Sequence, residues 1–225
     1  PGGMAWAVAA HDARTNPDGS PVTGSFYFTS VYIGAWQSES PVYVKQAWRE
    51  ALDNGHEVGV HTHSHSHGGM FTVGEWDGEI TTCLDWLTKP YDPDEVTFEP
   101  DDTKGIGASL SEIPGFRTPY LEYNDATLEV VASLDNFRYD CSIEEGWQWD
   151  HGGDSFNWPY TLDGGSPGHE VLVEWGSKEP IEPHPGLWEM PAYPVIVPPD
   201  EVAAEYGIPT GLRDKLKQAV SWFDV

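Results

Sequence analysis

Histidines are concentrated in one short segment of this chain. Five of the nine histidines lie in residues 55–67, and four of them, His61, His63, His65 and His67, alternate with threonine or serine. Neutral imidazole is the commonest protein ligand for divalent transition metals. Packing alone does not explain so dense a cluster, so the segment indicates a metal site. A solvated histidine tract is the alternative.

The spacing of these histidines suggests how a metal site would be built. His61 and His65 are four residues apart, which lets both side chains converge on one metal from a helix face or from a turn after a strand. Asp12 follows a separate apolar run, residues 4–10, so its carboxylate could meet them where two strands end. One carboxylate and two imidazoles leave positions open for water and substrate, as a catalytic metal site needs.

The pattern of apolar residues predicts the elements that hold this site. Short apolar runs predict strands at 4–10, 25–29, 57–60, 114–117, 137–142, 171–175 and 187–190. Helical spacing predicts helices at 41–54, 73–87, 125–134 and 211–220. This order predicts an α/β fold with a parallel sheet or barrel, in which active sites lie at strand ends. Residues 146–210, which are rich in Trp, Pro and Gly, predict a loop-rich insertion with short strands.

Composition limits the partners of the chain. The net charge is −26, from 37 acidic and 11 basic residues among 225. Such a charge disfavours binding to nucleic acids and to anionic membranes. There is no apolar run that could span a bilayer and no signal peptide at the start. We expect a monomer with a single domain over residues 1–225 that lacks its last strand or strands.

Two further residue types leave alternatives open. Cys83 and Cys141 are too few for a disulfide framework, so they form either one bridge or two buried thiols. The 11 tryptophans fit a hydrophobic core, and beside many Gly and Pro they also fit a groove that stacks against sugar rings.

Several segments resemble one enzyme family. GHEVGVHTHSH, residues 55–65, resembles the histidine motif of the carbohydrate esterase family 4 polysaccharide deacetylases, the NodB-homology group. FRTPY, residues 116–120, is similar to that family's Arg-x-Pro-Tyr motif, and residues 139–142, YDCS, resemble its third motif. Residues 158–163 and 186–191 resemble segments of the chitin deacetylases, notably the arthropod type. The motifs follow the family's order between residues 11 and 191, which makes the resemblance specific.

The resemblance implies a fold, a reaction and a cofactor. The fold is a distorted (β/α) barrel of the polysaccharide deacetylase type. The reaction is removal of acetyl groups from an N-acetylated, chitin-like polysaccharide by water that a divalent metal activates. Zinc is the expected metal, with Co2+ or Ni2+ as alternatives. The implied ligands are Asp12, His61 and His65, and an offset register through His63 and His67 is the alternative.

The resemblance also implies roles for residues around the metal. Arg117 and Asp140 would form an ion pair that orients the catalytic base. The backbone N–H of Tyr120 would hold the oxyanion of the reaction. The positions expected to contact the substrate are Pro119, Tyr120, Trp158 and Trp188.

Two departures from the family's pattern bear on activity. The family has two adjacent aspartates where this chain has His11 and Asp12, so His11 stands in the position of the base. An imidazole with an ordinary pKa of about 6.5 can accept a proton. The family's late histidine, its general acid, has no counterpart after His184.

These departures leave three alternatives. The chain is an active deacetylase, a metal-binding and catalytically weak carbohydrate-binding homologue, or a metal-binding module of unrelated fold. Since polymeric chitin lies outside cells, we expect a secreted or periplasmic protein.

Overall fold

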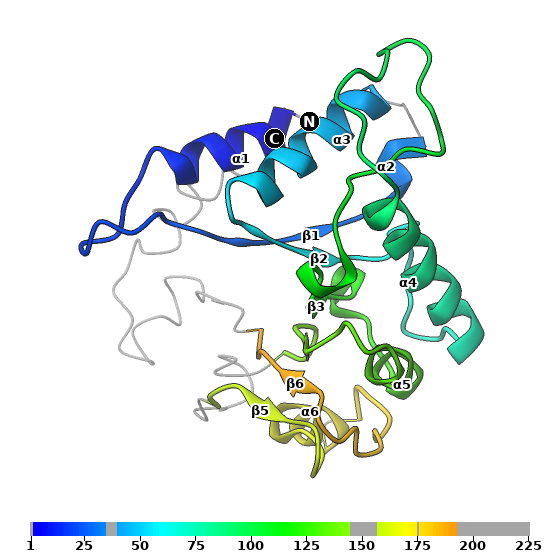
Figure 1. Cartoon of the computed structure of the whole chain (residues 1–225). Coiled ribbons are helices and arrows are strands. Elements are labelled where there is room, and N and C mark those ends of the chain that lie inside the picture. The colour runs from blue at the N-terminus through cyan, green and yellow to red at the C-terminus, as the bar shows by residue number, and fades with distance from the viewer. Residues whose placement is uncertain (1, 35–39, 145–156, 175, 193–225) are drawn as a thin grey trace, which may run out of the picture.

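A largely parallel sheet runs through the described part of the chain (Figure 1). The structure is a computed structural model, and it describes residues 2–34, 40–144, 157–174 and 176–192. Six strands follow the order β1-β2-β3-β4-β6-β5. The pairs from β1 to β6 are parallel, and β5 runs antiparallel to β6. The expected α/β fold with a parallel sheet is therefore confirmed.

Most of the predicted elements are present, with somewhat different ends. The strands are β1 Ser25–Phe28, β2 Glu57–Val60, β3 Gly115–Phe116, β4 Tyr139–Asp140, β5 Tyr160–Thr161 and β6 Trp188–Glu189. The helices are α1 Gly2–Asp12, α2 Val31–Gly34, α3 Pro41–Asp53, α4 Val73–Thr88, α5 Asp125–Ser133 and α6 Pro167–Glu174. Two 3-10 turns are η1 Leu110–Glu112 and η2 Pro119–Leu121. The predicted helix at 211–220 lies outside the described residues.

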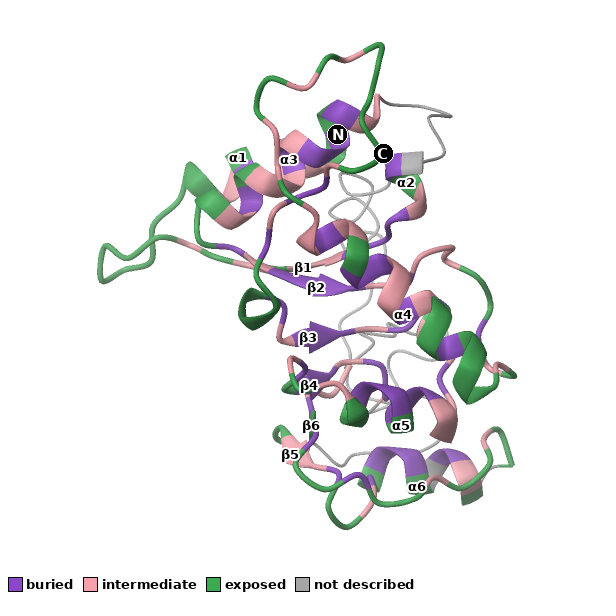
Figure 2. Cartoon of the chain, turned by 45° about the vertical axis from the view of Figure 1, so that its right-hand side comes forward, coloured by how far each residue is buried: buried purple, intermediate pink, exposed green. Residues whose placement is uncertain are grey.

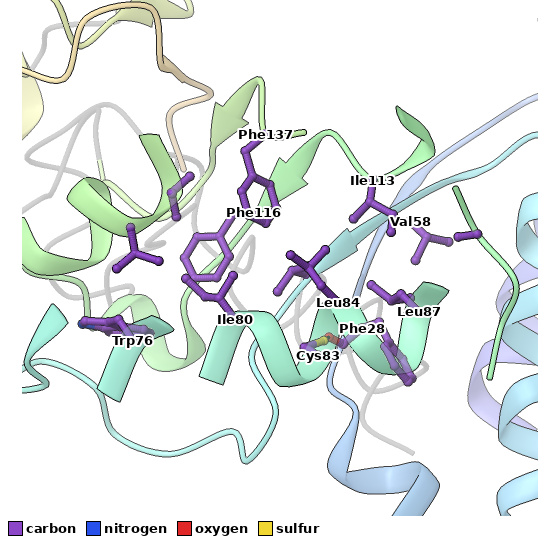
Figure 3. Close-up of a cluster of buried hydrophobic side chains, with 14 of the residues drawn as sticks. Phe28, Val58, Trp76, Ile80, Cys83, Leu84, Leu87, Ile113, Phe116 and Phe137 are labelled. Carbon is purple, nitrogen blue, oxygen red and sulfur yellow. The ribbon is translucent and has the colours of Figure 1, made fainter. Parts of the chain in front are cut away.

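The hydrophobic core lies between the sheet and the helices on one of its faces. Figure 2 shows α4 and α5 on the same side of the strands. In Figure 3, Phe28 and Phe116 from the strands meet Ile80 and Leu87 from α4, and all four side chains are buried. Burial of a side chain of this size contributes about 1.5–3 kcal/mol. This layer therefore fixes the strand ends relative to α4.

Local signals explain where the two central helices begin. In α4, the Thr72 hydroxyl accepts from the Glu75 backbone N–H, and the Glu75 carboxylate accepts from the Thr72 backbone N–H. In α5, Asn124 and Thr127 form the same reciprocal cap. Such boxes satisfy backbone donors that a helix start leaves free. The loop after β2 and the loop after β3 each lead into a firmly capped helix.

The first predicted strand is wrong. Residues 4–10 belong to α1, which packs against α3 and buries Val8. A short apolar run does not by itself distinguish a buried strand from a helix, and this run is rich in alanine, the best helix former. His11 and Asp12 therefore lie at the end of a helix and not at the end of a strand.

The strand predicted at 171–175 is also wrong, since residues 171–174 belong to α6. Pro167 stands at the start of this helix, and the Ser166 hydroxyl accepts from the His169 backbone N–H. The strand predicted at 187–190 is present as β6. Among the described residues, no helix combines the length and the apolarity needed to cross a bilayer.

Candidate functional site

The histidine run begins at the carboxyl end of β2, and β1 holds it there. The His61 backbone N–H donates to the Phe28 carbonyl oxygen at 2.8 Å, so the parallel ladder continues past Val60. The Thr29 hydroxyl then donates to the His61 carbonyl at 2.9 Å. These bonds fix His61 at the edge of the sheet where the family's chemistry was expected.

The turn after His61 has an unusual backbone. Thr62 and His65 both have positive φ, 68° and 56°, a region that non-glycine residues rarely adopt. Glu79 of α4 supports this turn. Its carboxylate accepts from the His63 and Ser64 backbone N–H groups at 2.9 and 2.8 Å and from the Ser64 hydroxyl at 2.7 Å. Sequence reasoning missed Glu79, since no pattern links it to the turn.

His61 and His65 lie side by side, as the metal prediction requires. Their ring centroids are 5.0 Å apart. The His61 Nδ1–H donates to the Arg117 carbonyl at 2.8 Å, which leaves Nε2 as the free nitrogen. Burial lowers the pKa of His61 to about 4, although the hydrogen bond to the Arg117 carbonyl opposes this shift. At neutral pH the ring is uncharged, which is the form that binds metals.

The structure does not bring Asp12 to these histidines. Asp12 accepts from Asn54 Nδ2 at 2.7 Å, and its other oxygen is 3.7 Å from His56 Nε2. Asn54 and His56 precede β2, whereas His61 follows it, and a four-residue strand spans roughly 13 Å. The prediction that Asp12 joins His61 at a common edge is therefore wrong. The cause is the mistaken strand at 4–10.

His11 lies at the same distant edge. Its ring packs edge-on against Phe26 at 5.5 Å and against His56 at 5.3 Å, and its Nδ1 is buried without a hydrogen bond. The proposed substitute base is thus not beside His61 either. Among the described residues, no group of three or more His, Cys, Asp or Glu side chains is arranged to hold a metal ion. The implied metal therefore fits only the two imidazoles.

Arg117 and Asp140 do not form the expected ion pair. Arg117 Nη1 donates to the Cys141 carbonyl at 3.0 Å and contacts Cys141 Sγ at 3.1 Å. Asp140 is fully buried and accepts from the Ser142 backbone N–H and hydroxyl at 3.0 and 2.7 Å. Asp140 belongs to the sheet face that carries Phe116, so its carboxylate points toward the helices and away from Arg117.

Asp140 instead has Glu189 as its neighbour on the adjacent strand β6. Burial raises the pKa of Asp140. Burial, followed by the charge of Asp140, raises the pKa of Glu189 well above its ordinary value. The buried carboxyl groups of Asp140 and Glu189 thus form a structural pair between adjacent strands. The sequence contained no spacing that links these positions.

Tyr120 lies directly beside His65, in a strained turn. It has a φ of 57° within η2, and its exposed ring contacts His65 at 4.9 Å and stacks on His67 at 4.1 Å with an angle of 12°. His67 Nδ1 hydrogen-bonds to Glu122 at 2.8 Å. Pro119 begins η2 and is buried, so it offers little surface to a ligand.

The remaining predicted residues are spread over the molecule. His63 Nδ1 bonds to the Ser30 hydroxyl at 2.8 Å, while His67 lies on Tyr120, so these two histidines do not converge as the offset register required. Trp188 is half-exposed on β6 and Trp158 is exposed just before β5, both on the other half of the sheet from β2.

The two cysteines are both free thiols, which excludes the alternative in which they form a bridge. Cys83 is buried in α4 and donates to the Phe28 carbonyl oxygen, whereas Cys141 lies beside Arg117.

Comparisons with known proteins give one family match and several matches to solved structures. The family model for polysaccharide deacetylase matches residues 20–137. No curated protein is similar enough in sequence to match the chain. Among solved structures, a family 4 carbohydrate esterase from Streptomyces lividans in complex with acetate is 14% identical, with 86% of this chain and 73% of that chain covered and a TM-score of 0.39. A polysaccharide deacetylase from Bacillus cereus is 16% identical, with 94% and 80% covered and a TM-score of 0.38.

A third solved structure is longer than the chain. It is the family 4 domain of a multidomain xylanase from the hindgut metagenome of Trinervitermes trinervoides, 10% identical with a TM-score of 0.35. The match covers 76% of this chain and 60% of that one, so the chain spans less than two thirds of its length.

Proposed function

The chain belongs to the polysaccharide deacetylase family, whose model matches more than half of it, and from this premise we propose that it is a metal-dependent hydrolase. It removes acetyl groups from an N-acetylated, chitin-like polysaccharide. The observation that carries the proposal is the pair His61 and His65, which lie 5.0 Å apart at the carboxyl end of β2 with Tyr120 beside them.

Zinc is the metal that we propose for this pair, with Co2+ and Ni2+ as alternatives. Neutral imidazole nitrogens suit all three ions. His61 is uncharged and presents Nε2, since its Nδ1 is held by the Arg117 carbonyl. When bound, such an ion polarises the acetyl carbonyl and activates water. The described residues supply two ligands and no carboxylate, so we derive no reaction step through the metal.

The residues around the pair would bind and orient the substrate. The backbone N–H of Tyr120 would donate to the oxyanion, and its exposed ring borders the site on the side of His65. Arg117 would present its guanidinium to the reacting groups from the end of β3. Trp158 and Trp188, both exposed, would stack on sugar rings farther along the polymer. Because polymers of this class lie outside cells, we propose a secreted or periplasmic location.

A carbohydrate-binding homologue with weak or no catalysis is the second candidate. One observation favours it: Asp12 and His11, the residues expected to complete the metal site and to act as base, lie at the opposite edge of β2. Exposed tryptophans would serve binding alone equally well. The two candidates predict the same ligand and differ in acetate release.

Acetate release from N-acetylglucosamine oligomers separates the candidates. The protein is stripped with EDTA, reloaded with zinc and assayed beside His61→Ala and a matched control, His63→Ala. We expect metal-dependent release by the wild type and by the control, since His63 bonds to Ser30 and lies apart from the pair. His61→Ala should release no acetate. Zinc-loaded wild type that retains oligomers without releasing acetate would establish the binding homologue and overturn the enzyme.

A further inference from the structure

Two loops meet beside the histidine pair, the loop that follows β2 and the loop that follows β3. At one contact, Asn124 Nδ2 donates to the Phe71 carbonyl oxygen at 2.8 Å, and the same asparagine caps α5. At the other contact, the His67 Nδ1–H donates to the Glu122 carboxylate at 2.8 Å, since a carboxylate only accepts. The first contact belongs to the start of a helix. The second lies next to Tyr120 and has no such structural role.

The second contact fixes the plane of the His67 ring. With its Nδ1–H held by Glu122, the ring lies over the Tyr120 ring, with centroids 4.1 Å apart and an angle of 12° between the planes. The hydrogen bond from His67 lowers the pKa of Glu122, so the carboxylate is charged at neutral pH. Hydrogen bonds to charged acceptors are stronger than those between neutral groups. His67 therefore covers one face of Tyr120 in a defined orientation.

The Tyr120 turn needs such a contact. Tyr120 and Leu121 both have positive φ, 57° and 56°, and non-glycine residues keep this conformation only where their surroundings impose it. Burial does not hold the Tyr120 ring, because 56% of the residue is exposed. The ring meets His65 edge-on at 4.9 Å and His67 face to face. The stack on His67 thus restrains a strained turn directly beside the histidine pair.

Stability of the fold does not account for the pair of His67 and Glu122. The His67 side chain is 70% exposed and that of Glu122 is 37% exposed. Contacts between polar side chains at such exposure contribute little to the free energy of unfolding. The pair is therefore better explained by what it does to Tyr120.

We propose that His67 and Glu122 are positioning residues that hold the Tyr120 turn in the conformation that deacetylation requires. This inference rests on the proposed function, in which the Tyr120 backbone N–H donates to the oxyanion. The direction of that N–H depends on the backbone angles of the turn, so a loosened turn would misdirect it. Both residues act through Tyr120 and not on the reacting atoms.

The first test removes the stack and then restores part of it. We expect His67→Ala to lower kcat for acetate release about three- to tenfold, the effect of one aromatic pair, with KM unchanged because the oxyanion forms only during the reaction. His67→Phe keeps a flat ring over Tyr120 and should recover part of the loss. Glu122→Gln keeps an oxygen that accepts from His67 and should retain more activity than Glu122→Ala. A kcat for His67→Phe no higher than that for His67→Ala would overturn the proposal.

A double variant tests whether His67 acts through Tyr120. Tyr120→Gly removes the ring and leaves a residue that adopts positive φ without strain. In this background, His67→Ala should cause no further loss of kcat, because the stack is already absent. An equal loss in both backgrounds would reject the positioning role.

His63→Ala is the matched control. His63 belongs to the same histidine run, but its Nδ1 bonds to the Ser30 hydroxyl after β1, away from Tyr120. This variant also loses one imidazole hydrogen bond and should leave kcat unchanged. If His63→Ala lowers kcat as much as His67→Ala does, the effect comes from disturbance of the whole run, and the role of His67 is rejected.

A second readout needs no catalysis. The ring protons of a histidine that lies over an aromatic face are shifted upfield in proton NMR spectra. The His67 signals are those that His67→Ala lacks. We expect Tyr120→Leu to move them downfield and to leave the His63 signals in place. Unmoved His67 signals in an active protein would reject this inference alone. If the wild type releases no acetate, the proposed function fails, and the spectra still show whether His67 stacks on Tyr120.

Discussion

Both ends of β2 carry histidines, and the two ends differ in what surrounds them. At the amino edge, His11, Asp12 and His56 pack around the end of α1. At the carboxyl edge, His61 and His65 converge in a turn that α4 holds in place. Parallel strands bring their carboxyl ends together, and the helices that follow leave that edge open to ligands. Residue type alone therefore does not identify a site; the strand end does.

Removal of one imidazole at the carboxyl edge should have the largest effect. We expect His61→Ala to lower zinc affinity by more than about a hundredfold, since loss of an outer partner alone costs 10- to 100-fold. Titration calorimetry with zinc measures this. His56→Ala, at the amino edge, is the matched change and should leave zinc affinity as it is. Equal zinc affinity in His61→Ala and His56→Ala would show that the two ends of β2 do not differ in metal binding.

The anchor of the histidine turn should come next. Glu79→Ala removes three hydrogen bonds from a turn with two positive-φ residues, so we expect a loss of about tenfold in zinc affinity. Glu75→Ala, also in α4, breaks only the helix cap and should lower the melting temperature slightly without changing zinc binding. If Glu79→Ala binds zinc like the wild type, the turn needs no support from α4.

A pH series tests the buried carboxyl pair. Folding raises the pKa of Glu189 above its ordinary value of 4.5, so the native state binds this proton more tightly than the unfolded state. Stability is therefore lost as pH rises from about 4.5 through the folded pKa. Glu189→Gln should match the wild type at pH 4 and exceed it at pH 8, by about 1.4 kcal/mol for each unit of the shift.

Urea unfolding at the two pH values measures this difference. Glu129 in α5 is exposed, so Glu129→Gln is the control. Its difference in free energy of unfolding from the wild type should be the same at both pH values. If the difference in free energy of unfolding between the wild type and Glu189→Gln is the same at pH 4 and pH 8, the carboxyl pair is ionised in the native state.

The smallest effect is expected at the amino edge. Asp12→Ala removes the bond from Asn54 at a half-exposed site, so we expect a loss of roughly 0.5–1 kcal/mol in the free energy of unfolding. Zinc content and acetate release should not change. For the same reason His11→Asp should not raise acetate release. If elemental analysis shows a sharp fall in the zinc content of Asp12→Ala, Asp12 is a ligand of the metal.

The sequence predicted the elements around His61 well because their signals are local. A glycine follows the end of α3, β2 contains two buried valines, and the histidines follow at once. The run at 4–10 carried no such signal, since alanine-rich apolar residues suit a helix as well as a buried strand. Because this run was predicted to be a strand, His11 and Asp12 were expected at the carboxyl ends of the strands, whereas they lie beside the amino end of β2.

Contacts between distant segments could not be predicted from one sequence. The pairing of Arg117 with Cys141 depends on which face of β4 each residue occupies, and the family's motif had suggested Asp140. Glu79 reaches the histidine turn across a loop, and Glu189 meets Asp140 only because β6 lies beside β4. Such partners follow from strand order, which residue patterns do not specify.

The turn with left-handed Thr62 and His65 has a consequence for the use of this segment outside the protein. A synthetic peptide with residues 55–67 would avoid these left-handed backbone conformations. Each of its histidines would then bind an immobilised metal ion equally well. In the folded chain each one has a separate partner: His63 has Ser30, His67 has Tyr120, and only His61 and His65 face each other. Folding thus converts a repetitive tag into positions that are no longer equivalent.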